Sequence, residues 1–531
     1  ALLPLVTLTL VTGCGGGGSS MMPAAAGPPP FTSVTQVRVS QPSTFSAGCD
    51  GVPATGTLYT DTAAEPYLAV NPTSPLNLIA AWQQNRWSDG GAQGLNLAAS
   101  FDGGMTWTLS NAAFSRCTGG GSGNAGNYAR ATDVWLTVSP TGVIYALSLS
   151  FTGGALLPGS SSGMLVAQSH DGGFTWSAPT ALIQDGSQVF NDKGSITADS
   201  TDANFVYAVW DRVTGPTAGP SYFAVTANAG STWQAARRIY DPGAQNQTLG
   251  NQIVVLPGDV LVNIFTEFDT GTGGATAALL RTIHSSDHGT SWSAPVTISD
   301  LRAVGTRDPR SGAAVRDGSD LESVSVAPGG VIYVAWQDSR FSGGQHDGIA
   351  MSQSSDGGMT WSVPVQVNAD HNVQAFTPTI HVRADGVIGV TYYDLRNNTS
   401  SLPGTLLTDC WLVTSSDAGV TFKESHLSGP FDLRLAPDSQ GLFLGDYESL
   451  ASTANGFLPF FVQTDAGSQV RSDAFIAFPP ASAAAQAMAA GAVASFQALA
   501  APAGMTMTPA GARRVMQRIR LTRAQRLHQP G

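Results

Sequence analysis

The stretch Ser100-Phe101-Asp102-Gly103-Gly104-Met105-Thr106-Trp107 decides the expected fold, because its pattern recurs along the chain. The same order of Ser or Thr, Asp or Asn, Gly, Thr or Ser, and an aromatic residue is found at 169–176, 226–233, 285–292, 354–361 and 415–422. The final aromatic residues lie 57 to 69 positions apart, a spacing that suits a repeated unit of four strands. We call each of these segments an Asp box.

Each residue type in an Asp box has a mechanical role. The Asp carboxylate is expected to accept hydrogen bonds from backbone N–H groups of its own turn, and Gly supplies positive φ. The aromatic residue is expected to cover apolar surface between neighbouring sheets. These carboxylates therefore predict a folding device between the third and fourth strands of a unit, not a catalytic or calcium site.

A second repeat predicts the number of units. Seven hairpins, each with apolar strands around a Pro-, Gly- or Asn-containing turn, are centred on 71–75, 139–142, 199–204, 256–259, 327–330, 383–386 and 452–456. The last hairpin has no Asp box after it, and the strand at 34–40 has none before it. Pairing of 34–40 with 474–478 would close a ring and remove an open sheet edge. We expect an all-β chain, a β-propeller with four-stranded blades: seven are favoured, and six are the alternative.

The composition agrees with many short strands and argues against a nucleic-acid partner. The 531 residues include 61 Gly and 31 Pro, 12% are charged, and the formal net charge is −12. Gly and Pro favour tight turns between strands. An acidic protein is repelled by a phosphate backbone, so no nucleic-acid partner is expected.

The first residues predict export and a lipid anchor. An apolar run over 1–11 leads into Val11-Thr12-Gly13-Cys14. An apolar segment ending in small residues is typical of a secretory signal, and small residues before Cys14 resemble a bacterial lipobox. An ordinary signal peptide is the alternative. We expect a signal over 1–14, a flexible tether over 15–33, a propeller over 34–478 and an Ala-rich, then Arg-rich, tail over 479–531 that is helical or disordered. The expected protein is extracytoplasmic, monomeric and held at the cell-envelope membrane through Cys14.

Three cysteines remain after Cys14. Cys49 precedes the first Asp box and Cys117 follows it, so a Cys49–Cys117 disulfide is plausible in an oxidising compartment. Cys410 is then left over, as a buried strand residue. Three such scattered cysteines do not favour a metal site, and no metal or cofactor is expected.

Strand geometry gathers charge on the face opposite the Asp boxes. First strands begin there with Glu65, Arg130, Asp133, Asp192, Lys193, Asp320, Glu322, Asp446, Tyr447 and Glu448. Second strands end there with Arg86, Asp89, Asp211, Arg212, Glu267, Asp269, Asp338, Arg340, Asp394 and Arg396. We call this face the rim.

Two interpretations compete for the rim. In the first, Asp and Arg residues of adjacent blades form ion pairs that hold the blades together. In the second, they form a polar pocket for a sugar, because carboxylates and guanidinium groups bind hydroxyl and carboxylate groups well. The second interpretation assigns ligand binding to Arg86, Arg130, Lys193, Arg212, Arg340, Arg396, Asp211, Asp338 and Asp394.

The Asp boxes at 100–422 resemble those of the sialidase (BNR-repeat) superfamily, and the span from about 45 to 478 resembles exo-α-sialidase-like bacterial proteins. The resemblance implies a Tyr nucleophile activated by Glu, an Asp acid/base and three Arg that bind the substrate carboxylate. Tyr447, Glu267 and Asp89 are the matching catalytic candidates. Glu267 is followed by Arg281, and Arg86 lies near Asp89, as the resemblance implies.

Two departures keep the function open. Glu65-Pro66-Tyr67-Leu68 stands where the family has Arg-Ile-Pro, and family catalytic domains have six blades. A sialidase-like exo-acting hydrolase on surface or environmental glycans and a non-catalytic propeller that binds glycan or protein are both retained. The hydrolase requires Glu267 or Glu322 within about 3 Å of the Tyr447 hydroxyl, and Arg130, Arg212, Arg340 and Arg396 in one pocket with Tyr447.

Overall fold

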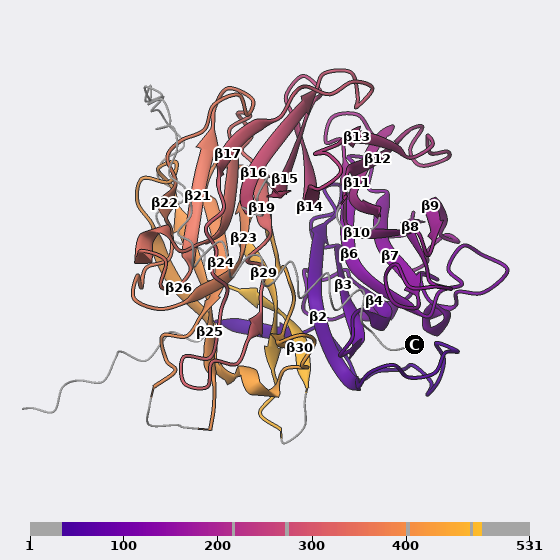
Figure 1. The fold of residues 1–531 in the computed structure, drawn as a ribbon, viewed down its shortest axis with the longest axis horizontal. Helices are drawn as coiled ribbons and strands as arrows, with labels where there is room; N and C mark the ends of the chain where they lie inside the picture. The colour runs from indigo at the N-terminus through magenta and orange to yellow at the C-terminus, as the bar shows by residue number, and fades with distance from the viewer. Residues whose placement is uncertain (1–33, 215–217, 271–275, 400–403, 468–470, 480–531) are drawn as a thin grey trace, which may run out of the picture. The chain divides into compact units, whose positions relative to one another are not determined.

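The computed structural model describes residues 34–214, 218–270, 276–399, 404–467 and 471–479, and it is almost entirely strand and turn (Figure 1). Within these ranges no helix has the length and apolar character needed to cross a membrane. The predicted signal, tether and tail, including Cys14, lie outside the described residues except for Pro479.

The strands pair in antiparallel sets of four that follow one another along the chain. The first set is β2 (Leu58–Val70), β3 (Leu78–Trp87), β4 (Ala92–Ser100) and β5 (Thr108–Ser110). The second is β6 (Arg130–Val138), β7 (Ile144–Thr152), β8 (Ser161–Ser169) and β9 (Thr180–Gly186). The third is β10 (Val189–Ala198), β11 (Phe205–Thr214), β12 (Ser221–Ala227) and β13 (Arg237–Tyr240).

Four further sets complete the succession. They are β14 (Gln247–Leu256), β15 (Val260–Thr270), β16 (Thr276–Ser285) and β17 (Val296–Asp300); β19 (Glu322–Val326), β20 (Ile332–Asp338), β21 (Gly348–Ser354) and β22 (Val365–Gln366); β23 (Ala375–Val382), β24 (Ile388–Asp394), β25 (Leu407–Ser415) and β26 (Lys423–Asp432); and β28 (Ser449–Thr453), β29 (Gly456–Thr464), β30 (Ser472–Phe478) and β1 (Thr35–Arg38). We call these sets blades 1 to 7.

The short elements lie in the connections between strands. Parallel strands β18 (Val315–Arg316) and β27 (Leu442–Phe443) pair outside the blades, and the 3₁₀ helices are η1 (Arg116–Thr118), η2 (Arg340–Ser342) and η3 (Leu433–Leu435).

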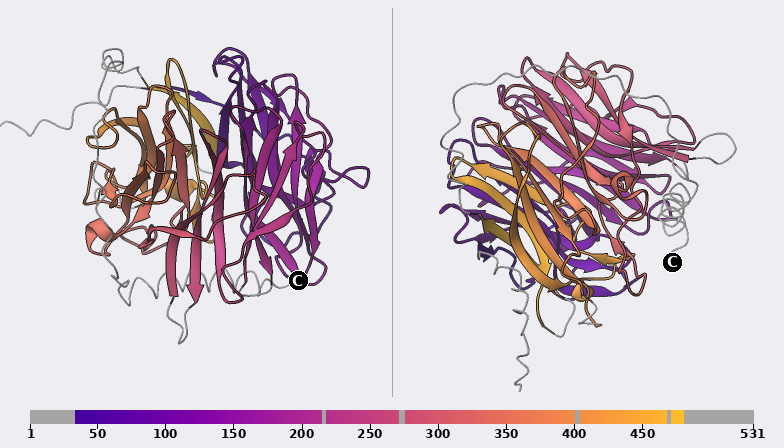
Figure 2. Two further views of the ribbon diagram at one scale, coloured as in Figure 1. Left: turned by 90° about the horizontal axis from the view of Figure 1, so that it is seen from above. Right: turned by 90° about the vertical axis from the view of Figure 1, so that its left-hand side faces the viewer.

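The first strands of the blades meet around a common centre. β2 contacts β6, and the contacts continue through β10, β14, β19 and β23 to β28, which in turn contacts β2. Figures 1 and 2 show the sheets following one another in this way. This arrangement of four-stranded sheets is that of a β-propeller.

The predicted pairing of the N-terminal strand is confirmed. β1 is antiparallel to β30, with Thr35 opposite Phe478 and Arg38 opposite Phe475. β1 therefore completes a blade whose other three strands come from the far end of the described chain. The pairing covers an edge of β30 that would otherwise expose unpaired backbone groups.

The Asp boxes make the hydrogen bonds expected of a folding device. Asp171 Oδ1 accepts from the Phe174 and Thr175 backbone N–H groups at 3.1 and 2.9 Å, and its Oδ2 accepts from the Thr175 hydroxyl at 2.5 Å. In the third box Asn228 Oδ1 accepts from the Thr232 N–H at 2.9 Å, and its amide donates to the Thr232 hydroxyl at 2.8 Å. The amide therefore replaces the carboxylate while the turn is kept.

The aromatic residue of each box packs where two blades meet. Trp107 packs against a core that joins blades 6, 7 and 1, and Trp176 against one that joins blades 1 and 2. Trp233, Trp292, Trp361 and Phe422 occupy the same place at the next four junctions. In blades 1 to 6, one box thus links the local turn to packing between sheets.

The cysteine predictions are confirmed. Cys49 and Cys117 form a disulfide with Cα atoms 4.9 Å apart, and Cys410 is a free, buried thiol on β25. The disulfide fixes the segment before β2 to the loop that contains η1.

Asp171→Ala tests the role of the box carboxylate. Loss of its four hydrogen bonds, from the Ser169 and Thr175 hydroxyls and two backbone N–H groups, is expected to lower the free energy of unfolding by about 1–2 kcal/mol. Asp171→Asn is the matched control and should lose less than half as much, since Asn228 already performs this role. Urea denaturation measures both, and equal losses would contradict the hydrogen-bond explanation.

Candidate functional site

Charged side chains reach the centre of the propeller through bulges in the first strands. Glu65 on β2, Asp133 on β6 and Lys193 on β10 each lie at a shift in strand register, with φ of 49°, 51° and 43°. Non-glycine residues seldom adopt this left-handed conformation, which costs free energy and is concentrated at functional sites. The bulges bring three charged residues from three successive blades to one place.

Lys193 forms the middle of this cluster. Its ammonium nitrogen lies 2.7 Å from Asp446 Oδ2, 3.3 Å from Asp133 Oδ1 and 3.4 Å from Glu65 Oε1. The Glu65 side chain is fully buried, whereas the Lys193 side chain keeps 13% of its surface exposed. The cluster is therefore closed on the Glu65 side and open to solvent beside Lys193.

Two arginines complete the cluster from outside the bulges. Arg316 on β18 binds Asp446 through Nε at 2.9 Å and Nη2 at 2.5 Å. Arg86, at the end of β3, donates to the Ser439 hydroxyl at 3.2 and 3.3 Å. Both guanidinium carbons lie 4.4 Å from the centre of the Phe443 ring. The β18–β27 pairing thus carries Arg316 from the connection after blade 4 into this site. We call Glu65, Asp133, Lys193, Arg316 and Asp446, with Arg86, the central charge cluster.

The three carboxyl groups of the cluster differ in proton affinity. Burial raises the pKa of Glu65 to about 8 despite the nearby Lys193 ammonium. For Asp446, burial is outweighed by Arg316 and Lys193, which hold its pKa well below its ordinary value. Burial also opposes ionisation of Asp133, but Lys193 lowers its pKa. An acid and two ionised carboxylates therefore surround one ammonium group.

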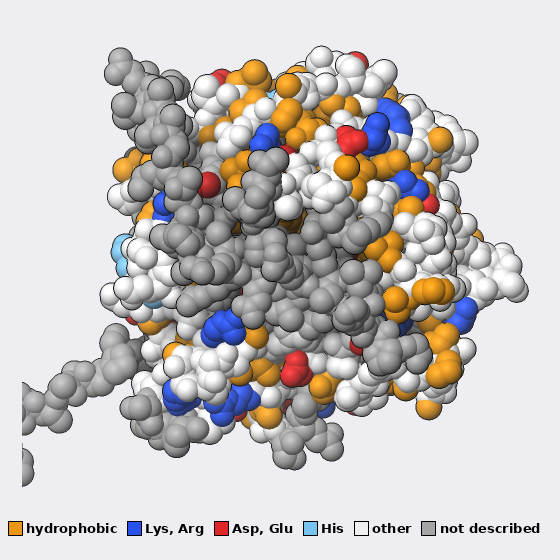
Figure 3. All heavy atoms as spheres, viewed as in Figure 1, with side chains coloured by type: hydrophobic (Ala, Val, Ile, Leu, Met, Phe, Trp, Pro, Cys, Tyr) orange, Lys and Arg blue, Asp and Glu red, His pale blue; other side chains and the backbone are white. Residues whose placement is uncertain are grey.

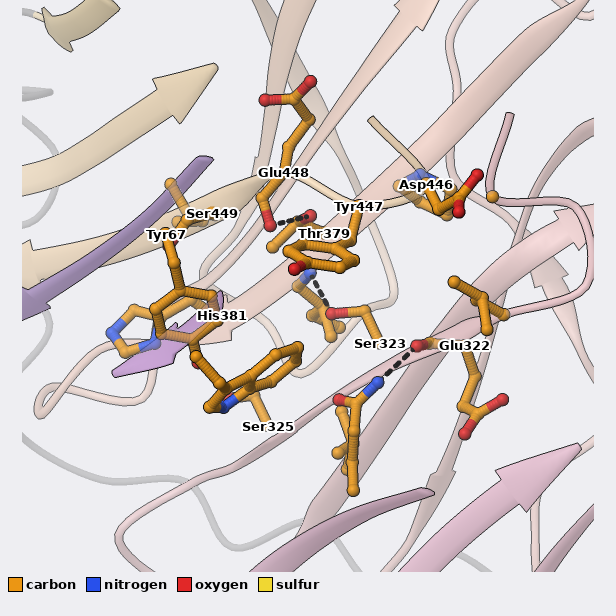
Figure 4. A pocket seen from close by; sticks show the side chains of 18 residues that line it. Tyr67, Glu322, Ser323, Ser325, Thr379, His381, Asp446, Tyr447, Glu448 and Ser449 are labelled. Atoms are coloured by element: carbon orange, nitrogen blue, oxygen red, sulfur yellow. Dashed lines mark hydrogen bonds between the residues drawn. The ribbon is translucent and has the colours of Figure 1, made fainter. Parts of the chain in front are cut away.

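A cavity of about 120 Å³ adjoins the cluster and extends along the first strands. Its lining includes Tyr67, Trp135, Asp446 and Tyr447 at the cluster, and His381 farther along β23. The Tyr67 and Trp135 rings lie 4.4 Å apart and the Trp135 and Tyr447 rings 5.6 Å apart. Figure 4 shows Tyr67 and Tyr447 with Ser323 and Thr379 around the same space. The site combines three aromatic rings with hydroxyl and charged groups.

The predicted arginines do not share this cavity. Each is bound to a carboxylate: Arg130 to Asp89 at 2.7 Å, Arg212 to Asp185 at 2.6 Å, Arg340 to Asp338 at 2.7 Å, and Arg396 to Asp394 at 2.5 Å. The first two pairs join adjacent blades, and Arg340 also reaches Asp300 of blade 4. None of these arginines is among the residues that line the cavity. Arg130, Arg212 and Arg340 therefore form ion pairs between blades, whereas the two carboxylate partners of Arg396, Asp394 and Glu424, lie in its own blade 6.

The predicted nucleophile and base are also separated. The Tyr447 hydroxyl donates to the Val134 carbonyl at 3.1 Å. Glu267 instead accepts from the Tyr240 hydroxyl at 2.7 Å and pairs with Arg281 at 3.3 Å. Glu322 accepts from the Thr266 hydroxyl at 2.9 Å. The cavity lining contains Tyr447 and Glu322 but neither Glu267 nor Asp89, so the Tyr–Glu arrangement implied by the resemblance is not formed.

The remaining carboxylates that were predicted to bind a ligand instead accept hydrogen bonds near the ends of strands. Asp211 is buried and accepts from the Gly250 N–H at 3.0 Å, and burial raises its pKa to about 8. The indole N–H of Trp336 donates to Asp338, and that of Trp411 to Asp394. None of the three lines the cavity. Of the predicted ligand-binding residues, Lys193 and Arg86 belong to the central charge cluster.

Sequence reasoning missed Arg316, Ser439, Phe443 and the buried amide of Gln83, which donates to Glu65 and accepts from Arg86. Arg316 and Phe443 belong to irregular connections with no repeat to mark them. The sequence did single out Glu65, since Glu65 stands where the sialidase resemblance implies an Arg. Among the described residues no group of three or more His, Cys, Asp or Glu side chains is arranged to hold a metal ion.

No protein-family model matches the chain, and no curated protein matches it. Solved structures with a similar arrangement of strands include a Penicillium chrysogenum α-L-arabinanase complexed with arabinobiose, at 13% identity and a TM-score of 0.43, covering 84% of this chain and 98% of that one. They also include the Hadza microbial sialidase Hz136, at 15% identity and 0.43, covering 75% and 76%. A Dyadobacter fermentans protein of unknown function matches at 14% and 0.43, covering 80% and 97%. Likeness at this level does not bear on activity.

Glu322, which lines the cavity, allows the electrostatics of the site to be tested. Its Oε1 is buried without a hydrogen-bond partner, and burial raises its pKa to about 8. The folded chain therefore holds a proton here that the unfolded chain releases above about pH 4.5. Its contribution to stability is greatest at low pH and is lost as the pH rises from about 5 to about 8.

Glu322→Gln should raise the melting temperature at pH 8.5 by at least about 2 °C. The amide cannot ionise, and it keeps an oxygen that accepts from Thr266. At pH 5, where the native carboxyl is protonated, the two proteins should melt together. Calorimetry at both pH values measures the difference, and a difference independent of pH would contradict the burial argument.

Lys193→Met tests the charge balance of the cluster. Removal of the ammonium leaves buried carboxylates with fewer opposite charges, so the free energy of unfolding at pH 8 should fall by about 3 kcal/mol or more. The loss should be smaller at pH 5, where Glu65 is neutral. Lys423→Met is the control, because Lys423 is exposed and is the only other lysine in the chain. Similar urea-denaturation results for both variants would exclude a special role for Lys193.

Proposed function

We propose that this protein is an extracytoplasmic, seven-bladed β-propeller that binds a glycan at the rim, where the central charge cluster meets the cavity. The proposal rests on one observation. The aromatic rings of Tyr67, Trp135 and Tyr447 line the cavity beside the cluster in which the side chains of Lys193 and Arg316 are partly exposed. Aromatic rings provide flat apolar surfaces for sugar faces, and the charged groups provide hydrogen bonds to hydroxyl or carboxylate groups. Lipid anchoring through Cys14 and a monomeric state belong to the same proposal.

The contacts among first strands support the proposed count of seven blades. Seven four-stranded sets are described, and the first strand of blade 7 contacts that of blade 1. A ring closed by β1 and β30 accounts for both facts. A six-bladed alternative would leave one of these sets outside the ring.

Binding without sialidase chemistry fits the geometry better than sialidase catalysis. The arginines proposed to bind a substrate carboxylate are held by Asp residues, and the Tyr447 hydroxyl is held by a backbone carbonyl. A Tyr nucleophile needs a base within hydrogen-bond reach. The side chains around Tyr447 therefore support contact with a sugar ring more than attack on one.

Glycoside hydrolysis by another pair of carboxyl groups is a second candidate. Glu65 has a pKa raised to about 8, while Asp446, which also contacts Lys193, is held ionised. A neutral acid beside an ionised carboxylate is the arrangement that glycosidases commonly use. The full burial of Glu65 is the obstacle, because a general acid must reach the glycosidic oxygen.

A glycan array followed by calorimetry tests the binding proposal, with neutral and acidic glycans included. Arg316→Gln and Tyr67→Leu should each weaken binding at least about tenfold, because one loses a charged donor and the other an aromatic face. Arg302→Gln is the control, since Arg302 is also a partly exposed rim arginine but binds Asp300 outside the cavity. Loss of binding in the control, or no glycan bound by the native chain, would contradict the proposal.

A fluorogenic glycoside panel, sialosides first, separates the two candidates. Binding without release of the aglycone is expected. Release that is abolished by Glu65→Gln but retained in Tyr447→Phe would instead establish the carboxyl-pair hydrolase, and release abolished by Tyr447→Phe would restore the sialidase mechanism.

A further inference from the structure

The exposed apolar side chains of the propeller lie at one end of the blades. Eight large hydrophobic residues are exposed in the described ranges, and all come from a hairpin turn, an Asp box or the residues just after a box: Leu76, Phe101, Met105, Phe174, Met359, Val363, Val365 and Val420. We call this end of the blades the box face. In the view of Figure 3, charged side chains lie singly or in small groups among polar and apolar side chains. The box face is apolar at its tips, whereas the rim holds the central charge cluster.

Four of these residues come from neighbouring turns of blades 1 and 2. The Phe101 and Phe174 rings stack with centres 4.9 Å apart. The Leu76 carbonyl accepts from the Gly103 N–H at 2.9 Å, which places Leu76 beside the first box. Leu76, Phe101, Met105 and Phe174 are each about half exposed, at 57, 47, 49 and 49%. Apolar side chains gathered in this way mark an interaction surface.

The described chain begins beside this patch. Thr35 on β1 pairs with Phe478, and a Cβ placed on Gly104 of the first Asp box would lie 3.2 Å from the Phe478 ring. The N-terminal end of β1 therefore lies at the box face next to Phe101 and Met105. Cys14, the expected acylation site, precedes Val34 by 20 positions in the sequence.

We propose that the Leu76–Phe101–Met105–Phe174 patch docks on the lipid surface to which the chain is anchored. Partial burial of four side chains gives weak binding by itself, but an anchor that enters beside the patch raises the local lipid concentration and makes weak contact effective. The exposed carboxylates Asp102 and Asp171 lie in the same turns, so a zwitterionic surface suits the patch better than a strongly anionic one. Docking turns the rim, with the partly exposed Lys193 of the central charge cluster, away from the membrane.

Flotation with phosphatidylcholine vesicles tests the patch separately from the anchor. The full chain carrying Cys14→Ser, which cannot be acylated, should bind these vesicles weakly. Adding Phe101→Ser and Phe174→Ser should lower the bound fraction at least about tenfold with little change in melting temperature, because both rings are exposed. Gln345→Ser, an exposed substitution on the rim, is the matched control and should leave binding unchanged. Added phosphatidylserine should not strengthen the binding.

Hydrogen exchange on the native, vesicle-bound chain tests the orientation. Amides in 74–78, 101–106 and 172–175 should become protected, and those in 341–346 should not. Three results would overturn the proposal: no flotation of the Cys14→Ser chain at any lipid concentration, equal flotation of the double-serine variant, or protection of the rim instead. A double-serine variant that changes only the sedimentation of the chain would assign the patch to a second copy of the protein.

Discussion

Hydrogen bonding between β1 and β30 is the constraint on which the rest of the structure depends. It joins residues near the two ends of the described chain and supplies the outer strand of blade 7. With blade 7 complete, β28 packs between β23 and β2, and the first strands of all blades can converge. Convergence leaves little room at the centre, and the register shifts of β2, β6 and β10 turn charged side chains into it.

The central charge cluster is a consequence of that convergence. Its members come from blades 1, 2 and 3, from the β18 connection and from the connection before β28, and no two neighbouring blades could form it alone. Buried opposite charges compensate for one another only when the geometry is satisfied on every side. Misalignment of a single blade would leave an uncompensated charge, so the cluster stabilises the correct ring more than it stabilises any one blade.

The two ends of the blades differ in the kinds of side chain that they present. Tight Asp-box turns hold one end and expose apolar tips, while the other end gathers ion pairs and strained bulges. A cavity with aromatic walls runs from the central charge cluster along the first strands. Most of the rim arginines form ion pairs between blades. Lys193 and Arg316, which both bind Asp446, remain partly exposed beside the cavity. A ligand that reaches this place would meet aromatic faces and a few directed polar groups.

Local pattern was enough to predict the repeating units. The Asp boxes, the seven hairpin turns, the pairing of β1 with β30 and the Cys49–Cys117 disulfide all follow from residue order, because turns and alternating strands are encoded within a few neighbouring residues. The sequence also placed Glu65, Asp133, Lys193 and Asp446 at one end of the blades. The sequence could not decide which side chains meet, since a rim arginine can reach a partner in its own blade, in the next blade or at the centre of the propeller. Only the tertiary structure shows that Arg130, Arg212, Arg340 and Arg396 pair with carboxylates. It also shows that Tyr447 and Glu267 have different hydrogen-bond partners and that Arg316 binds Asp446. These outcomes depend on bulges and on a parallel β18–β27 contact between connections more than a hundred residues apart, for which the sequence carries no local signal.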